Sequence, residues 1–99
     1  MKYLMFVRVD DALVGTVEDN AEDWVDTTPQ RLDGDRLRPT AEARTVRSRA
    51  LVSDGPFAET KEWIAGFDLL DCASLDEAIA IAARHPVARF GAIELRQVG

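Results

Sequence analysis

The sequence predicts an α+β sandwich, in which helices cover one face of a mostly antiparallel sheet. Strand-like runs rich in β-forming residues lie near the two ends of the chain, at residues 2–9 and 91–98. A third run, residues 62–70, also alternates as a strand does, and a well-capped helix follows it. The resulting order of strand, short helix, strands, helix and strand is typical of this class.

The first strand, residues 2–9, is apolar on both sides. Side chains alternate along a strand, so its apolar residues divide between two faces. Tyr3, Met5, Val7 and Val9 share one face, and Leu4 and Phe6 share the other. We therefore expect a central strand that is covered on each side.

Residues 16–33 predict a short acidic helix followed by turns. Thr16 or Asp19 would cap the helix, and Pro29 would limit it or begin a second turn. The run Asp33–Asp35, with glycine at its centre, is interpreted as a turn. The buried stripe of the helix would consist of Ala21, Trp24 and Val25.

Beyond a break at Pro39, residues 43–53 favour extended structure with one solvent-exposed face. A tight hairpin inside this run is a second possibility, although it has no glycine signal. The run Asp54–Phe57 is predicted to turn, because glycine and proline stand side by side in it. In the next strand, strict alternation would put Trp63, Ala65, Phe67 and Leu69 on one face and Ile64, Gly66, Asp68 and Leu70 on the other.

The second helix has the clearest local signals. Ser74 at its N-cap and Glu77 three residues later form a capping box. Arg84 and His85 would occupy its last turn, and Pro86 would stop it. Its buried stripe is predicted to be Leu75, Ala78, Ile79, Ala82 and Ala83.

The bulk properties exclude several classes of protein. Ninety-nine residues fit one domain, and a net charge of -6 argues against a nucleic-acid or anionic-membrane surface. No apolar run reaches membrane-spanning length, so we expect a cytoplasmic protein. Cys72 is the only cysteine, so no internal disulfide can form, and no metal-ligand spacing or cofactor motif occurs. We therefore predict neither metal nor cofactor.

The apolar pattern also predicts a second copy of the chain. Helices on one face of the sheet leave the other face uncovered, yet the strands at residues 2–9 and 62–70 are apolar on both sides. In a chain this small, an uncovered apolar sheet face is best explained by a homodimer.

The stretch Asp54–Lys61 resembles the signature of the DGPF group of YCII-related proteins. Three further stretches are similar to that group: residues 1–6, 74–86 and 91–98. The resemblance covers residues 1–9 and about 42–98. It implies a ferredoxin-like α+β fold that dimerises through its sheets, often with a cleft at the dimer interface.

Two departures from this family limit what the resemblance implies. Residues 10–41 are shorter than, or divergent from, the usual first helix and following strand. Related enzymes are thought to use a His–Asp dyad with the histidine early in the chain, whereas this chain has no histidine before His85. The resemblance therefore does not place that dyad here.

The signature and its surroundings supply the candidate catalytic residues. Asp54 would be a proton-transfer group at a dimer cleft, or its side chain would only fix the turn. Glu59 and Lys61 share a face of an extended chain, so they would bind a charged small molecule or form a surface pair. His85 would be a base, or would interact with the carboxyl end of the helix.

Apolar and acidic residues offer further candidates. Phe57 and Trp63 would line a substrate pocket, whereas core packing is the expected role of Phe67. Cys72 is expected to be a buried, inert thiol. An acidic cluster could hold a hard cation but lacks a calcium-loop register, so we interpret it as a solvated helix face. It consists of Glu18, Asp19, Glu22, Asp23 and Asp26.

Two functions remain open from the sequence. The first is a dimeric small-molecule enzyme or binder that performs acid–base chemistry of the lyase or isomerase type on a small organic acid. The second is a non-catalytic regulatory or protein-interaction module linked to alternative sigma factor signalling, as the genomic neighbourhood of the DGPF group implies. The charges of the signature favour the first, and the missing early histidine favours the second.

Overall fold

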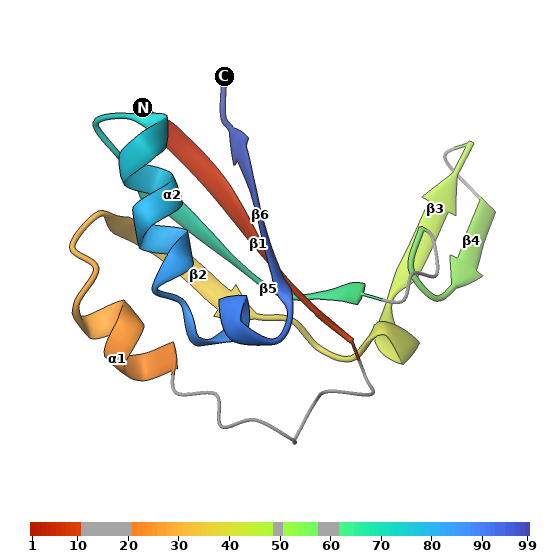
Figure 1. Ribbon diagram of the computed structural model, residues 1–99. Coiled ribbons are helices and arrows are strands. Elements are labelled where there is room, and N and C mark those ends of the chain that lie inside the picture. Colours follow the sequence, from red (N-terminus) through yellow and green to blue (C-terminus); the bar gives the residue numbers. More distant parts are fainter. Residues whose placement is uncertain (11–20, 49–50, 58–61) are drawn as a thin grey trace.

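The computed structural model describes residues 1–10, 21–48, 51–57 and 62–99 (Figure 1). Its body is a four-stranded sheet in the spatial order β2-β5-β1-β6, and each neighbouring pair is antiparallel. The strands are β1 (Lys2–Asp10), β2 (Arg31–Arg36), β5 (Glu62–Asp71) and β6 (Ala92–Gln97).

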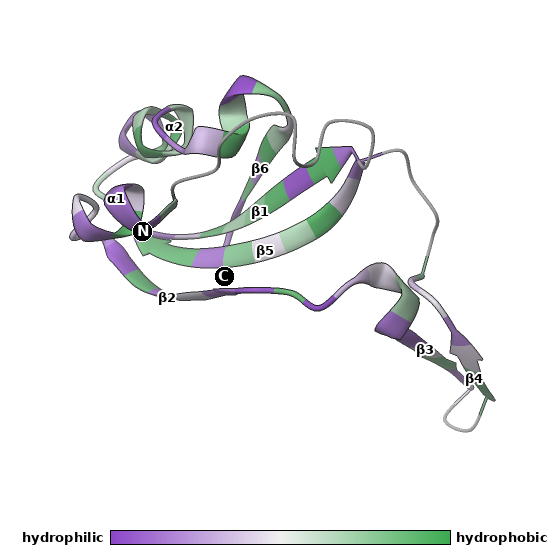
Figure 2. Ribbon diagram, turned by 90° about the horizontal axis from the view of Figure 1, so that it is seen from below, coloured by the Kyte–Doolittle hydropathy of each residue, from purple (hydrophilic) through white to green (hydrophobic). Residues whose placement is uncertain are grey.

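Two helices, α1 (Ala21–Asp26) and α2 (Leu75–Ala83), lie over the same face of this sheet (Figure 2). The predicted α+β class is therefore confirmed. The strand order, with one helix between β1 and β2 and one between β5 and β6, is compatible with a ferredoxin-like fold.

The core lies between the helices and one face of β1. Tyr3, Met5, Val7 and Val9 are buried on that face, as predicted. Leu4 and Phe6 are only half-buried on the opposite face, which Figure 2 shows without a helix over it. β1 is central, as expected, but within the described part of this chain it is covered on one side only.

Strand β5 departs from strict alternation because it contains a bulge. Val7 pairs with Gly66 but Arg8 pairs with Ile64, so Ala65 is the extra residue. A bulge shifts the side chains on one side of it to the other face. Trp63 therefore lies opposite Val9 on the helix-covered face, and its predicted grouping with Phe67 and Leu69 is wrong.

The run Asp33–Asp35 is not a turn but part of edge strand β2. Gly34 is required there by close approach, since a Cβ on it would lie 2.3 Å from Asp68 Oδ1 and 2.6 Å from the Phe67 carbonyl oxygen. Glycine in a strand can mark such an approach as well as a turn. The sequence alone did not distinguish the two.

Helix α1 forms where the acidic helix was predicted. Its Trp24 is buried and donates a hydrogen bond from Nε1 to the Ile81 carbonyl, 2.9 Å away, which ties α1 to α2. Its last residue is Asp26, so the chain has already left the helix before Pro29. The predicted caps, Thr16 and Asp19, lie outside the described residues.

Helix α2 confirms its predicted cap but not its whole buried stripe. Ser74 Oγ accepts a hydrogen bond from the Glu77 backbone N–H (3.1 Å), and the Glu77 carboxylate accepts one from Ala73 (3.2 Å). The buried row consists of Ala78, Ile81, Ala82 and, beyond the helix end, His85. The predicted members Leu75, Ile79 and Ala83 are exposed.

Strands β3 (Arg44–Arg47) and β4 (Leu51–Asp54) form a separate hairpin, which was the second possibility for this run. A single 3-10 turn, η1 (Thr40–Glu42), follows the predicted break at Pro39 and leads into it. Figures 1 and 2 show the hairpin projecting from the sheet, on the side away from the helices. Its strands are mostly exposed on both faces, so the expected single wet face is not observed.

Candidate functional site

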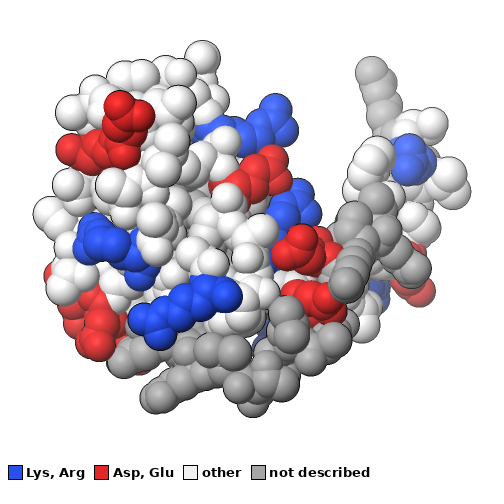
Figure 3. Space-filling view, viewed as in Figure 1, with Lys and Arg blue, Asp and Glu red and all other residues white. Residues whose placement is uncertain are grey.

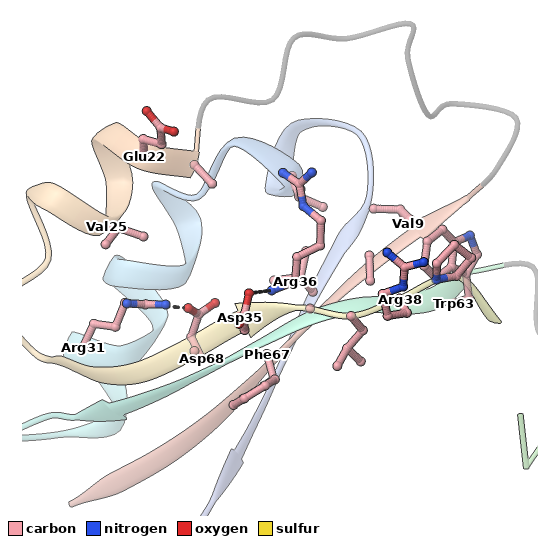
Figure 4. Close-up of a pocket in the computed structure, with 18 of the residues that line it drawn as sticks. Val9, Glu22, Val25, Arg31, Asp35, Arg36, Arg38, Trp63, Phe67 and Asp68 are labelled. Carbon is pink, nitrogen blue, oxygen red and sulfur yellow. Dashed lines mark hydrogen bonds and ion pairs between the residues drawn. The ribbon is translucent and has the colours of Figure 1, made fainter. Parts of the chain in front are cut away.

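A cleft of about 1070 Å³ lies on the helix-covered side of the sheet, at its β2 edge (Figure 4). Helix α1, strands β2 and β5, and the 3-10 turn η2 (Pro86–Arg89) all contribute to it. Its apolar wall includes Val9, Val25, Leu37, Trp63 and Phe90. Its charged lining consists of Glu22, Asp26, Arg31, Asp35, Arg36, Arg38 and Asp68. This size and mixture of apolar and polar groups are typical of small-molecule sites.

The deepest charged group of the cleft is Asp68 on β5, which is only 7% exposed. Its Oδ1 accepts a hydrogen bond from Arg31 Nε at 2.7 Å, and the two form an ion pair. Burial raises the pKa of the Asp68 carboxyl, and the hydrogen bond and charge of Arg31 offset part of that rise. A buried carboxyl with a raised pKa beside a cleft can hold and transfer a proton.

The absence of a side chain at Gly34 makes room for this pair. A Cβ at that position would lie 2.3 Å from Asp68 Oδ1 and 2.7 Å from the Arg31 guanidinium. Real Cβ atoms do not come so close, so Arg31 can reach Asp68 only because position 34 is glycine.

His85 directly precedes the turn η2 and is 5% exposed. Its Nδ1 accepts a hydrogen bond from the Val87 backbone N–H at 3.1 Å, which caps the turn η2. Its ring meets that of Trp24 edge to face, with 4.9 Å between the centroids. Because Nδ1 is an acceptor, the neutral ring carries its proton on Nε2. The side chain thus caps the turn that follows it.

His85 also acts on Asp68, since the protonated form of its ring lowers the pKa of that carboxyl. The structure therefore brings a late histidine and a strand aspartate into one region of the core. Sequence analysis identified His85 but missed Asp68 and Arg31. One signal was available, since Asp68 is the single charged residue in the otherwise apolar run 63–70.

The residues predicted from the signature are divided between two places. Trp63 lines the cleft, whereas Asp54 and Phe57 lie at the hairpin. The Asp54 side chain is 90% exposed and pairs with Arg44 Nε at 3.2 Å. Phe57 is 77% exposed, and the Arg47 guanidinium stands 5.0 Å from its ring centroid. Glu59 and Lys61 lie outside the described residues.

Phe67 does not belong to the buried core, contrary to its prediction. It pairs with Phe6 and is half-buried on the face of the sheet opposite the helices. The bulge in β5 explains the difference, because it separates the face of Phe67 from that of Trp63. Cys72, by contrast, is buried as predicted, and burial raises the pKa of its thiol.

Other kinds of site find little support in the part of the chain that the structure describes. There, no three His, Cys, Asp or Glu side chains gather in a way that could hold a metal ion. Two members of the predicted acidic cluster, Glu18 and Asp19, fall outside that part. No helix among the described residues is long and apolar enough to span a membrane. On the face seen in Figure 3, acidic and basic side chains are interspersed.

Comparison with known proteins agrees with the arrangement of strands and helices. The YCII-related domain matches residues 1–99. The chain belongs to the YCII-related family. It is also similar to the uncharacterized protein R00369 of Rhizobium meliloti (strain 1021), at 60% identity over 50 residues. That similarity covers 48% of this chain and 40% of the relative, so the chain spans less than half of the relative it matches.

The single histidine of this YCII-related chain is His85, which lies late in the sequence. The region 10–41 nevertheless supplies a helix and a strand of six residues each, α1 and β2. These two short elements form one wall of the cleft. The arginine and the glycine that surround Asp68 both come from β2.

Proposed function

We propose that this YCII-related protein is a small-molecule enzyme or binder of the acid–base type, and that the cleft beside β2 is its site. One observation carries the proposal: the buried carboxyl of Asp68, whose pKa is raised by burial, lines a cleft of about 1070 Å³ with a largely apolar wall. Perturbed carboxyls in such clefts are candidate acids and bases.

Each residue has a distinct role in this proposal. Asp68 takes a proton from one atom of the ligand. It then returns the proton to a neighbouring atom, as an isomerase step requires, or gives it to the departing group as the bond to that group breaks, as a lyase step requires. Arg31 fixes the carboxylate through its 2.7 Å hydrogen bond. His85, when protonated, lowers the pKa of the Asp68 carboxyl. Trp63 supplies an apolar wall against which a ligand can lie.

A homodimer with ferredoxin-like subunits is part of the same proposal. Leu4, Phe6, Phe67 and Leu69 lie next to one another on the open face of the sheet. A second copy would remove these side chains from water. The hairpin projects on that same side (Figure 2), so Asp54 and Phe57 would then lie near the partner. Asp54 as a catalytic group stays a prediction that depends on this dimer.

The test is a thermal-shift screen of wild type and Asp68→Asn against small organic acids, amides and phenols. A ligand that stabilises wild type raises its melting temperature by mass action. Loss of that shift in Asp68→Asn, but not in Asp54→Asn, would support the cleft as the site. The reverse pattern would move the site to the signature hairpin. If no ligand raises the melting temperature of wild type or of Asp68→Asn, although both proteins are folded, that result would contradict a small-molecule function.

The hairpin favours a second function, that of a regulatory or protein-interaction module. Four apolar side chains are exposed on or beside it: Val46, Leu51, Val52 and Phe57, at 60%, 62%, 57% and 77%. Exposed apolar groups of this density often mark protein contacts. A protein partner that is retained by the wild type and lost with Val52→Asp, but kept by Asp68→Asn, would establish this alternative instead.

A further inference from the structure

We infer that Arg36 is the anchor of the cleft and that the ligand it selects is a small monocarboxylate with an apolar body. This inference rests on the proposed function, because it names the ligand class of the same cleft. It concerns recognition, whereas the proposed function concerns Asp68 and proton transfer.

The position of Arg36 on β2 directs it into the cleft. Its partner across the strands is Gly66, which has no side chain to stand beside it. Figure 4 shows the Arg36 side chain rising from the sheet, between the Arg31–Asp68 pair at one end and Val9 and Trp63 at the other. The guanidinium is therefore presented to the space that a ligand would occupy.

Arg36 also differs from the other two arginines of the lining in being unengaged. Arg31 is bound to Asp68, and Arg38 pairs with Glu42 at 3.1 Å. Within the described residues, the Arg36 guanidinium makes neither a hydrogen bond nor an ion pair, and only its backbone N–H is bound, to Asp35. A guanidinium offers two parallel N–H donors, which match the two oxygens of a carboxylate.

The rest of the lining restricts the charge of the ligand. Four carboxylates and three arginines line the cleft, so the protein adds no excess of positive charge there. A phosphate ester or a dicarboxylate would meet one unengaged cation and several acids. A single carboxylate can be matched by Arg36 alone, without further cations.

The apolar wall restricts the remainder of the ligand. In Figure 4, Val9 and Trp63 lie on the side of Arg36 away from the Arg31–Asp68 pair, with Trp63 beside Arg38, and Phe90 and Val25 also line the cleft. Flat or branched apolar groups gain from burial against such side chains, roughly in proportion to the area removed from water. An aromatic or branched aliphatic acid therefore fits better than acetate, which has almost no apolar area to bury.

The experiment compares benzoate with benzamide, which share a ring and differ in charge, by NMR titration of the ¹⁵N-labelled full chain. Benzoate is expected to shift the amide signals of β2 and β5 residues around the cleft and to bind more tightly than benzamide. Arg36→Gln should weaken benzoate binding by at least about tenfold, which is the effect expected from the loss of one charge-assisted hydrogen bond. The benzoate affinity of Arg36→Lys should lie between those of wild type and Arg36→Gln, because lysine keeps the positive charge but lacks the two parallel N–H donors of the guanidinium.

Arg84→Gln serves as the matched control. Arg84 is an exposed arginine at the C-cap of α2 and does not line the cleft. Its substitution removes the same charge from the molecule and should leave the benzoate Kd unchanged. The dependence of the benzoate Kd on salt should also shrink in Arg36→Gln but not in Arg84→Gln.

Three results would overturn the assignment. Equal benzoate affinity in wild type and Arg36→Gln would show that Arg36 is not the anchor. Benzamide bound in the cleft as tightly as benzoate would show that charge is not selected, and the proposed function of the cleft would stand. No shift of any cleft signal with either compound at about 10 mM, a concentration that reveals even millimolar ligands, would count against the cleft as a whole.

Discussion

At the scale of single residues, the Arg31–Asp68 pair shows how a charge is tolerated inside this small core. Removing one partner of a buried pair leaves the other uncompensated, which costs more than the pair contributes. Here the geometry also depends on what is absent, because Gly34 leaves the space through which Arg31 reaches Asp68. The residues that form the cleft floor are thus interdependent.

Gly34→Ala should disrupt this pair and destabilise the fold. The new Cβ would fall 2.3 Å from Asp68 Oδ1, so the carboxylate or the strand must move, at a cost of about 1–3 kcal/mol. Gly66→Ala is the control, since the nearest atom to its Cβ would be the Asp35 carbonyl oxygen at 3.1 Å, followed by Arg36 Cα at 3.7 Å. Urea unfolding of both variants gives the comparison, and equal losses would contradict a specific role for Gly34.

The raised pKa of Asp68 predicts a pH dependence with a definite sign. In the folded protein this carboxyl holds its proton above its usual pKa of 3.8, whereas the unfolded chain releases it. Between the pKa of the unfolded chain and the higher pKa of the folded protein, the folded state therefore binds more protons. The free energy of unfolding falls as the pH rises through this interval. The contribution is fully present below about 3.8.

Asp68→Asn removes this titration, so its stability should fall less than that of wild type over the same interval. Urea midpoints measured in small pH steps above 3.8 give the two curves. Parallel curves would show that Asp68 titrates alike in the folded and unfolded states.

At the scale of elements, α2 illustrates the limit of periodicity as a guide to burial. Its composition allows two apolar stripes, one through Leu75 and Ile79 and one through Ala78, Ile81 and Ala82. The second faces the sheet, because Trp24 of α1 bonds to the Ile81 carbonyl and His85 extends the same row. The orientation of the helix was thus decided by its neighbours.

Substituting the two isoleucines of α2 separates these stripes. Ile81→Ala should cost about 2–4 kcal/mol, because Ile81 is only 3% exposed and its loss leaves a cavity. Ile79→Ala should cost well under about 1 kcal/mol, because half of that side chain is already in water. Thermal or urea unfolding checks both, and a reversed order would mean that the helix faces the sheet with its other stripe.

At the scale of the whole molecule, the described residues leave the sheet with one covered face and one open face. The helix-covered face has the cleft at its β2 edge, and the open face has Phe6 and Phe67 at its centre. The proposed ligand would occupy the first face, and the proposed dimer would bury the second.

Phe67→Glu should abolish the proposed dimer. The new charge would stand opposite Phe6 on the open face, where a partner subunit would have to desolvate it. Leu75→Glu makes the same kind of change on the exposed side of α2, so it should leave association intact. Sedimentation at micromolar concentration measures the oligomeric state of wild type and both variants. A monomeric wild type would contradict the proposed dimer.

The sequence by itself determined where strands β1, β5 and β6 and helices α1 and α2 form, although it did not reveal the edge strand β2. Alternating apolar residues in β1 and β6 and the capping box of α2 are local signals, which act through neighbours a few residues apart. The class of the fold follows from their order, and the break at Pro39 follows from the proline itself. His85 and Trp63 were also identified as candidates from the sequence alone.

Only the tertiary structure decided where the cleft lies and which residues line it. The bulge in β5 placed Trp63 on the cleft side, and the edge strand β2 brought Arg31 to Asp68, 37 positions away along the chain. Glycine at position 34 predicts a turn when only its neighbours in sequence are considered. The atoms that require a glycine there, Asp68 Oδ1 and the Phe67 carbonyl oxygen, lie on the neighbouring strand β5. Such contacts depend on register between distant segments, which the local sequence pattern does not encode.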